Sequence, residues 1–209
     1  MKTAQRSTRA KDVSQIGMGT VKTTTLKHYT GTAKFLHWAI ALLIIMMLVF
    51  GQGFEDITNP DDMAFSLRGH STLGFTVITL LVLRILWRLG NPPPALPETV
   101  APTQAMLSKV SHLLLYALMI YVPATGIYTA AAHEYAVLPY GAFDVREVFG
   151  FLGASDFDGR RFLHEIGTWL LIALLAVHIT AAFLHQFVQK DGVLRRMWFG
   201  RGKKAPELN

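Results

Sequence analysis

The chain has 209 residues, of which 51% are hydrophobic and only 16% are charged, and its mean hydropathy is +0.33. This composition is too apolar for a soluble domain of this size, so it predicts an integral membrane protein. The formal net charge is +6, but the basic residues flank apolar stretches, which argues for membrane topology and lipid contact rather than nucleic-acid binding. The chain has no cysteine, which excludes disulfides and thiolate metal sites.

Composition divides the chain into three parts. The N-terminal segment is rich in lysine, threonine and serine and poor in apolar residues, so residues 1–33 are predicted to form a basic, disordered tail. Residues 34–189 contain the apolar stretches and are predicted to form one membrane domain. Residues 190–209 are basic again and are predicted to form a C-terminal tail.

Four apolar stretches are candidates for membrane-spanning helices. In the stretch 69–87, the only ionisable side chains are His70 near the start and Arg84 near the end. Three further stretches contain no Asp, Glu, Lys or Arg and reach the roughly 20 residues that a helix needs to cross a bilayer; they are 35–54, 110–132 and 166–188. We therefore predict an all-α bundle of four transmembrane helices.

The connections carry their own signals. Residues 91–102 are too rich in proline to be helical, and Pro123 with Gly126 is expected to bend the third span. The loop 133–163 is the longest external connection, and a short surface helix or a cap over the bundle is expected there.

Charge predicts the orientation. Of the 20 lysines and arginines, seven precede the first span, three surround the second connection and six follow the last span. These sixteen fall on one side, and positive charge is retained in the cytoplasm. Both termini are therefore predicted to be cytoplasmic. The four remaining cations lie on the external side among ten acids; they are Arg68, Arg146, Arg160 and Arg161.

Histidines define a candidate site at two depths. His164 and His178 are fourteen residues apart, which returns them to within about 40° of one helix face and separates them by roughly 21 Å. His70 begins the second span on the external side, and His37 lies near the cytoplasmic end of the first. The iron of a b-type haem takes two axial nitrogens from facing helices. We therefore predict two haems, bound by the pairs His37 with His178 and His70 with His164.

Each histidine also has a simpler interpretation. A single imidazole at a helix end often lies at the headgroup level without binding anything, whereas His178 lies deep in an apolar span, where an ionisable group is expensive. Small residues near the histidines leave room for a flat ring or serve ordinary helix packing; they are Gly74, Gly167, Ala181 and Ala182. A zinc or copper bundle or a transporter also remains open, although such a metal site needs three or four converging ligands.

Several motifs together resemble the bacterial cytochrome b561 family of four-helix dihaem membrane proteins. The resemblance covers residues 30–200 approximately, and the order and spacing of its histidine motifs agree. The residues that carry it are Phe35, Leu36, His37 and Trp38; Arg68, Gly69 and His70; His112, Pro123 and Gly126; His164 and Glu165; His178 and His185; and Lys190 with Asp191.

The resemblance implies a location in the inner membrane of a bacterium, two b haems on the four chosen histidines, and electron exchange with the quinone pool of a respiratory chain. It further implies an oxidoreductase that oxidises superoxide at the outer face and passes the electrons to ubiquinone. The N-terminal extension and the external loop look longer than in the compact family form. A haem-bearing membrane anchor that passes electrons between quinone and a partner dehydrogenase or hydrogenase is the alternative.

Six further residues are secondary candidates. Three external arginines, Arg68, Arg160 and Arg161, are expected to attract anionic superoxide. Arg84 lies nearly in phase with His70, at the inner level, where it either pairs with a haem propionate or extends to the surface. His185 is the rival inner ligand, with quinone contact or proton delivery preferred for it. His112 either contacts a propionate or quinone or is inert, and His28 and His133 are expected to be solvated.

Overall fold

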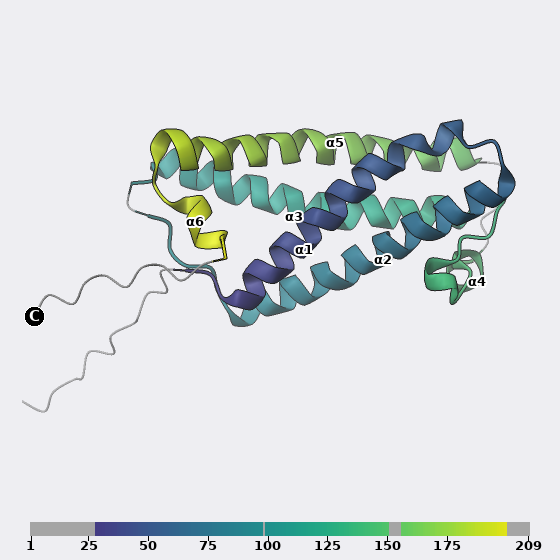
Figure 1. Cartoon of the computed structure of the whole chain (residues 1–209), viewed down its shortest axis with the longest axis horizontal. Helices are drawn as coiled ribbons and strands as arrows, with labels where there is room; N and C mark the ends of the chain where they lie inside the picture. Colours follow the sequence, from purple (N-terminus) through teal and green to yellow (C-terminus); the bar gives the residue numbers. More distant parts are fainter. Residues whose placement is uncertain (1–27, 98, 151–155, 200–209) are drawn as a thin grey trace, which may run out of the picture.

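The computed structural model describes residues 28–97, 99–150 and 156–199. Four of its helices are long and apolar enough to cross a membrane, which confirms the predicted number of spans. Figure 1 shows them running lengthwise through the molecule, with α1 crossing its neighbours obliquely. The long helices are α1 (Gly31–Phe50), α2 (Pro60–Gly90), α3 (Pro102–Ala130) and α5 (Phe157–Phe183). α1 packs mainly against α2, and α3 mainly against α5.

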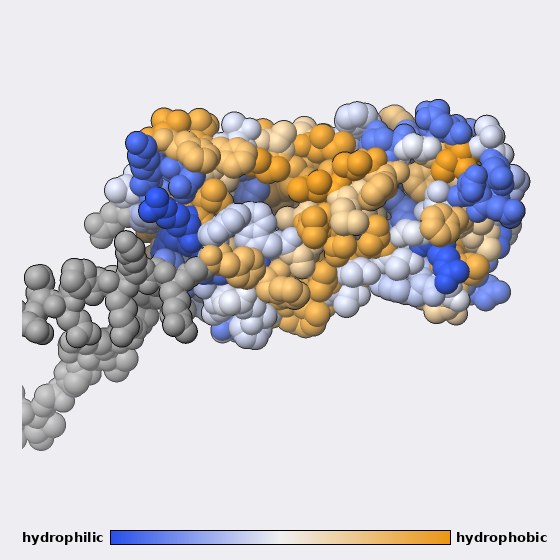
Figure 2. Space-filling view, viewed as in Figure 1, coloured by the Kyte–Doolittle hydropathy of each residue, from blue (hydrophilic) through white to orange (hydrophobic). Residues whose placement is uncertain are grey.

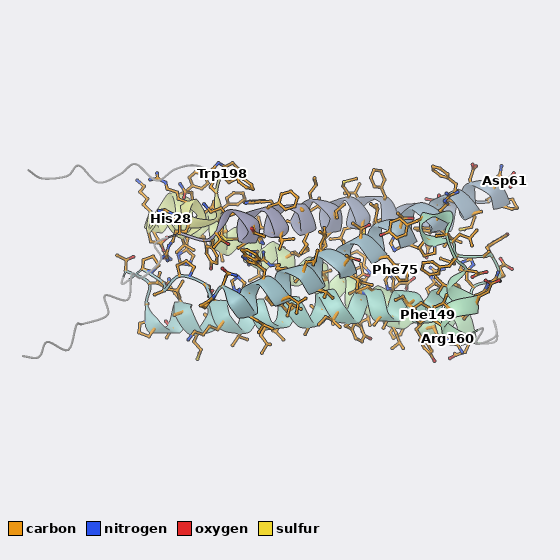
Figure 3. The ribbon with its side chains drawn as sticks, turned by 90° about the horizontal axis from the view of Figure 1, so that it is seen from below. His28, Asp61, Phe75, Phe149, Arg160 and Trp198 are labelled. Atoms are coloured by element: carbon orange, nitrogen blue, oxygen red, sulfur yellow. The ribbon has the colours of Figure 1, made fainter. Side chains whose placement is uncertain are left out.

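Short helices continue or connect the long ones. They are η1 (Gly51–Asp56), η2 (Pro139–Gly141), α4 (Val145–Phe149), the π-helix η4 (Leu184–Gln189) and α6 (Val193–Met197). Figure 3 shows His28 and Trp198 at one end of the bundle and Asp61 and Arg160 at the other. We call these the terminal end and the distal end. Both ends of the described chain therefore lie on the same side of the bundle.

All four long helices begin before their uncharged stretches, α1 by four residues and the other three by eight or nine. α2 begins at Pro60, where the Asn59 side chain accepts a hydrogen bond of 2.9 Å from the Asp61 backbone. Proline at the first helical position and acids in the first turn both favour a helix start. α3 likewise begins at Pro102 and α5 at Phe157, because polar first turns extend the helices beyond their apolar parts. His70 and His164 therefore lie inside helices rather than at their starts, which corrects the sequence-based placement.

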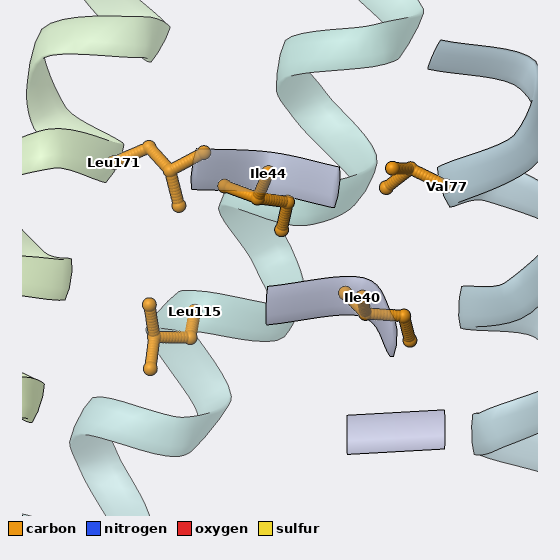
Figure 4. Close-up of a cluster of buried hydrophobic side chains, with 5 residues drawn as sticks. All are labelled: Ile40, Ile44, Val77, Leu115 and Leu171. Atoms are coloured by element: carbon orange, nitrogen blue, oxygen red, sulfur yellow. The ribbon is translucent and has the colours of Figure 1, made fainter. Parts of the chain in front are cut away.

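The apolar side chains form a small core and a large outer surface. Figure 4 shows the buried cluster at the centre, to which every long helix contributes; its members are Ile40, Ile44, Val77, Leu115 and Leu171. Most other large hydrophobic side chains face outwards. Figure 2 shows hydrophobic residues over the middle of the visible face and strongly hydrophilic ones gathered towards the two ends. An apolar outer surface between polar ends matches the hydrocarbon layer of a bilayer.

The expected external cap is present at the distal end. Residues 131–149, which we call the distal cap, contain η2 and α4 and bury Ala132, Val137 and Val145 almost completely. Tyr140 fastens the cap to α2, since its backbone N–H donates to Thr72 Oγ1 at 2.8 Å and its hydroxyl lies 2.8 Å from Thr76 Oγ1.

Part of the basic segment after η4 is helical and forms α6. α6 turns back onto α1: Lys34 Nζ donates to the Trp198 carbonyl at 3.0 Å, and Trp38 Nε1 donates to the Met197 carbonyl at 2.9 Å. Burying the indole N–H and the ammonium against backbone oxygens satisfies both groups. The remaining parts of the predicted tails, 1–27 and 200–209, lie outside the described residues.

Candidate functional site

The distal end brings together His70 of α2 and His164 of α5. Their ring centroids are 6.2 Å apart, with an interplanar angle of 80°. His164 Nδ1 lies 2.9 Å from the Val122 carbonyl, and because a carbonyl only accepts, this nitrogen carries the hydrogen. The Nε2 lone pair of His164 is therefore left for a ligand, an arrangement that metal-binding histidines commonly obtain from such a partner.

Glycines allow other helices to approach the distal pair. A Cβ atom at Gly126 would lie 3.1 Å from His164 Cε1, and one at Gly51 would lie 3.5 Å from His70 Cε1. The proximity of Gly126 explains a small residue in α3 opposite His164. α3 continues through Pro123 to Ala130, so the proline does not end the helix.

The terminal end brings together three histidines. His37 of α1 and His178 of α5 have ring centroids 6.4 Å apart, with an interplanar angle of 72°. His112 of α3 approaches His178 more closely, at 5.3 Å, and its Nδ1 donates to the Ser108 carbonyl at 2.6 Å. From the sequence, His112 was only a secondary candidate. The fold places its ring directly beside that of His178 in the inner histidine pair.

The ring separations test whether one iron fits between two imidazoles. A metal–imidazole nitrogen bond is about 2.0–2.1 Å long, and with about 1.1 Å from nitrogen to ring centre, two rings on opposite sides of a metal are roughly 6.2–6.4 Å apart. His70 with His164 and His37 with His178 match this separation. His112 with His178, at 5.3 Å, is too close. The chain therefore fits two bis-histidine sites, with His112 as a neighbour of the inner one.

Arg84 is held inside the terminal end rather than extended to the surface. Its Nη1 donates to the Ala33 carbonyl at 2.9 Å, and its Nε donates to the Tyr116 hydroxyl at 3.1 Å. The guanidinium thereby links α2 to α1 and α3 near the level of His37 and His178, and it adds a fixed positive charge there.

His185 contacts Asp191 rather than the inner histidine pair. Its Nδ1 pairs with the carboxylate of Asp191, whose other oxygen accepts a hydrogen bond of 3.0 Å from the Val193 backbone. The Asp191 side chain is only 3% exposed. This buried contact closes the turn between η4 and α6, which is a structural explanation for the spacing of the two residues.

Of the three arginines expected to attract superoxide, two contact neighbouring side chains. Arg161 donates to Glu165 at 2.5 Å and pairs with Glu55 of η1. Arg160 is buried, with its guanidinium carbon 4.7 Å from the centre of the Tyr128 ring. These contacts connect α5 to η1 and α3 at the distal end.

Arg68 is the exposed member of this group. It lies on α2 directly over the distal cap, where a Cβ atom at Gly141 would be 2.4 Å from its Nη2. Gly141 also has a φ of +66°, a backbone conformation that favours glycine.

Sequence reasoning missed several residues that support the site. Ser108 precedes His112 by one helical turn, a spacing that could have been recognised. The Val122 carbonyl is a backbone group and leaves no signal in the sequence. Gly167 was expected to leave room for a flat ring, but a Cβ atom there would lie 2.7 Å from the Tyr121 ring, so this glycine serves the contact between α3 and α5.

His133 is also placed differently from the prediction. It was expected to be solvated, but its ring lies 5.1 Å from Phe157 and its Nδ1 accepts a hydrogen bond of 3.1 Å from the Tyr135 backbone. The ring is half-buried at the base of the distal cap. Its position depends on the early start of α5, which the uncharged stretch did not indicate.

The sequence is similar to known proteins over nearly the whole described chain. The profile of the family described as prokaryotic cytochrome b561 matches residues 28–200. Cytochrome b561 homolog 2 of Escherichia coli is 28% identical over 177 residues, which are 84% of this chain and 93% of that protein. The probable superoxide oxidase CybB of Yersinia pestis is 26% identical, over 82% of this chain and 96% of its own length.

A third relative is cytochrome b562 of Cereibacter sphaeroides, which is 27% identical over 81% of this chain and 94% of its own length. The match of the family profile includes all four long helices and both histidine pairs. Such cytochromes carry b-type haem and transfer electrons within the membrane. The chain therefore belongs to the prokaryotic cytochrome b561 family and is an integral membrane protein for electron transfer.

Proposed function

We propose that the chain is a dihaem b-type cytochrome that oxidises superoxide at its distal end and reduces ubiquinone. In balance, two superoxide ions, one quinone and two protons give two molecules of oxygen and one quinol. The observation that carries the proposal is the presence of two facing histidine pairs, at 6.2 and 6.4 Å, on the helices of one bundle.

Four histidines would hold the two groups. His70 and His164 would bind the outer iron, and His37 and His178 the inner one. When bound, haem b supplies a one-electron centre at each level. The Val122 carbonyl orients His164, and two histidine ligands on each iron would favour electron transfer over oxygen binding.

The bundle between the two levels excludes water. The buried aliphatic side chains of the central core come from all four long helices. At the inner level, Arg84 places a positive charge that would pair with a propionate and stabilise added negative charge. His112 lies beside His178 and is the candidate for contact with quinone.

Two observations support the superoxide step. One relative is named probable superoxide oxidase, and Arg68 is an exposed cation at the distal end. Since Arg160 and Arg161 already contact other side chains, Arg68 is the residue proposed to attract the anion. The terminal end, which carries most of the basic residues, is proposed to face the cytoplasm.

The first test counts the haems. We expect two b haems per chain in a dithionite-reduced spectrum of the purified protein. His178→Ala should remove the inner centre and leave one haem, whereas the exposed His28→Ala should leave both. A wild-type chain with one haem, or an unchanged spectrum in His178→Ala, would contradict the pairing.

The second test addresses the substrate. Rapid mixing of the dihaem protein with superoxide and a soluble quinone should produce quinol faster than superoxide dismutates on its own. Arg68→Gln should slow this reaction, with a smaller dependence on ionic strength. A rate no greater than spontaneous dismutation would remove the superoxide assignment and leave the electron-transfer cytochrome.

A further inference from the structure

A hollow lies beside the turn that joins η4 to α6, away from both histidine pairs. It has a volume of about 170 Å³ and is lined by Gln186, Phe187, Lys190, Gly192 and Arg195. The backbone of this turn is unusual, since Lys190 has a φ of 54° and Gly192 a φ of 78°. Left-handed conformations at two closely spaced residues turn the chain sharply, which brings Arg195 of α6 to the same hollow as Lys190.

The charges around the hollow are not neutralised by the protein. Lys190 and Arg195 are both exposed, and in the part of the chain that the structure describes neither forms an ion pair. The acid nearest in sequence, Asp191, is buried and binds His185 and the Val193 backbone instead. The hollow therefore presents two cations that are available to an anion.

The surface next to the cations is strongly apolar. Phe187 is 66% exposed and Val188 is 70% exposed, and both precede Lys190 at the end of the uncharged stretch. Figure 2 shows strongly hydrophilic residues over the region of α6, close to hydrophobic residues at the end of α5. A border between exposed apolar side chains and exposed cations is the depth at which lipid headgroups lie.

We propose that this hollow binds an anionic phospholipid, with the phosphate on Lys190 and Arg195 and an acyl chain along Phe187 and Val188. The two cations match the charge of the headgroup, and cations beside a membrane attract anionic lipid. The apolar side chains distinguish a lipid from a free phosphate ion, because only a lipid covers them. The site is separate from electron transfer and does not depend on the proposed substrate.

The test measures lipid binding to the full-length haem-loaded protein by native mass spectrometry. Phosphatidylglycerol is compared with phosphatidylcholine of the same acyl chains, and we expect tighter binding of the anionic lipid. Since each cation near an anionic surface contributes a factor of about five, the double variant K190Q/R195Q should weaken phosphatidylglycerol binding at least tenfold. Lys109→Gln removes an exposed cation elsewhere at the terminal end and should have no effect.

Inorganic phosphate distinguishes the two possible sources of the anion. Millimolar phosphate should leave phosphatidylglycerol bound if the acyl chain contributes to the site. Displacement of the lipid by phosphate, or equal affinity for the two lipids in the wild type, would overturn the proposal. The haem spectrum of the double variant verifies that it is folded, and the wild-type comparison of the two lipids decides the question independently of any variant.

Discussion

Single glycines determine how closely the helices approach one another in this bundle. Gly126 faces the His164 ring, whereas Gly167, on the same helix as His164, faces Tyr121. The first glycine makes room for a candidate ligand and the second for a helix–helix contact. The distinction is a property of the packing, because the sequence does not show which side chain either glycine faces.

Gly167→Ala should destabilise the protein by about 1–3 kcal/mol, the usual cost of overfilling a packed contact. The added Cβ atom would lie 2.7 Å from Tyr121 Cε1 and 3.2 Å from Val122 Cγ2. The measurement is the thermal unfolding midpoint in detergent, followed by circular dichroism. Gly69→Ala is the control, since a Cβ atom there meets nothing within 4 Å and alanine favours the helix. Equal midpoints for Gly167→Ala and the wild type would contradict the packing argument.

At the scale of elements, the distal cap is held by polar contacts that respond to pH. Burial lowers the pKa of His133, with Glu134 opposing and Arg146 adding to the shift. Hydrogen bonds from Arg146 lower the pKa of Asp144, whose carboxylate also accepts a 2.9 Å hydrogen bond from the Arg146 backbone at the start of α4. Because its pKa is lowered, the Asp144 carboxylate stays ionised and holds the cap at any pH above about 3.8. Nearer to neutral pH, the stability of the cap therefore depends on the protonation of His133.

Acidification from pH 7.5 to 5.5 should loosen the distal cap. The unfolded His133 binds a proton near pH 6.5, and the folded one does so only at lower pH, so the folded cap loses stability as the pH falls below about 6.5. Protonation also removes the Nδ1 acceptor of the Tyr135 N–H. Hydrogen exchange in residues 135–149, corrected for intrinsic rates, measures the effect. His133→Gln should abolish it and His28→Gln should not; the same pH dependence in both variants would exclude His133 as its cause.

The number of helices was predictable from the sequence, and their ends were not. Uncharged stretches mark the part of a helix that lies in hydrocarbon, but Pro60 and Asn59 begin α2 well before that part. A helix continues as long as its backbone hydrogen bonds and caps permit, in lipid or in water. The distal cap was foreseen only as a possibility, since its contacts with α2 depend on residues far apart in the chain.

The histidine pairs could be inferred because helix geometry relates spacing to depth. The fourteen residues between His164 and His178 set two levels, and the opposite helices supplied the partners. The position of His112 beside His178 was missed, because the packing of α3 against α5 is a tertiary feature. The contact of His185 with Asp191 was missed for the same reason, since it requires the π-helical turn of η4.

For the whole molecule, an even number of spans places both described ends on one side. α6 and the start of α1 are joined at the terminal end through hydrogen bonds from Lys34 and Trp38. Because that end also carries most of the lysines and arginines, its proposed location is the cytoplasm. The absence of native cysteine makes the orientation directly measurable with single introduced thiols.

Thr58→Cys and Thr99→Cys form a matched pair for this measurement. Thr58 is exposed between η1 and α2 at the distal end, and Thr99 is exposed between α2 and α3 at the terminal end. In intact cells, a membrane-impermeant maleimide should label Thr58→Cys and leave Thr99→Cys unlabelled, and permeabilisation should expose both. The reverse pattern in intact cells would invert the proposed topology.

The aliphatic cluster of Ile40, Ile44, Val77, Leu115 and Leu171 has an electrical consequence. It occupies the centre of the bundle with side chains that offer protons no hydrogen-bonded relay, whereas electrons tunnel through hydrocarbon. On the proposed function, each electron moved along the roughly 21 Å between the two levels would cross much of the bilayer's insulating thickness without a proton travelling through the same core. Turnover would therefore generate a voltage across the membrane.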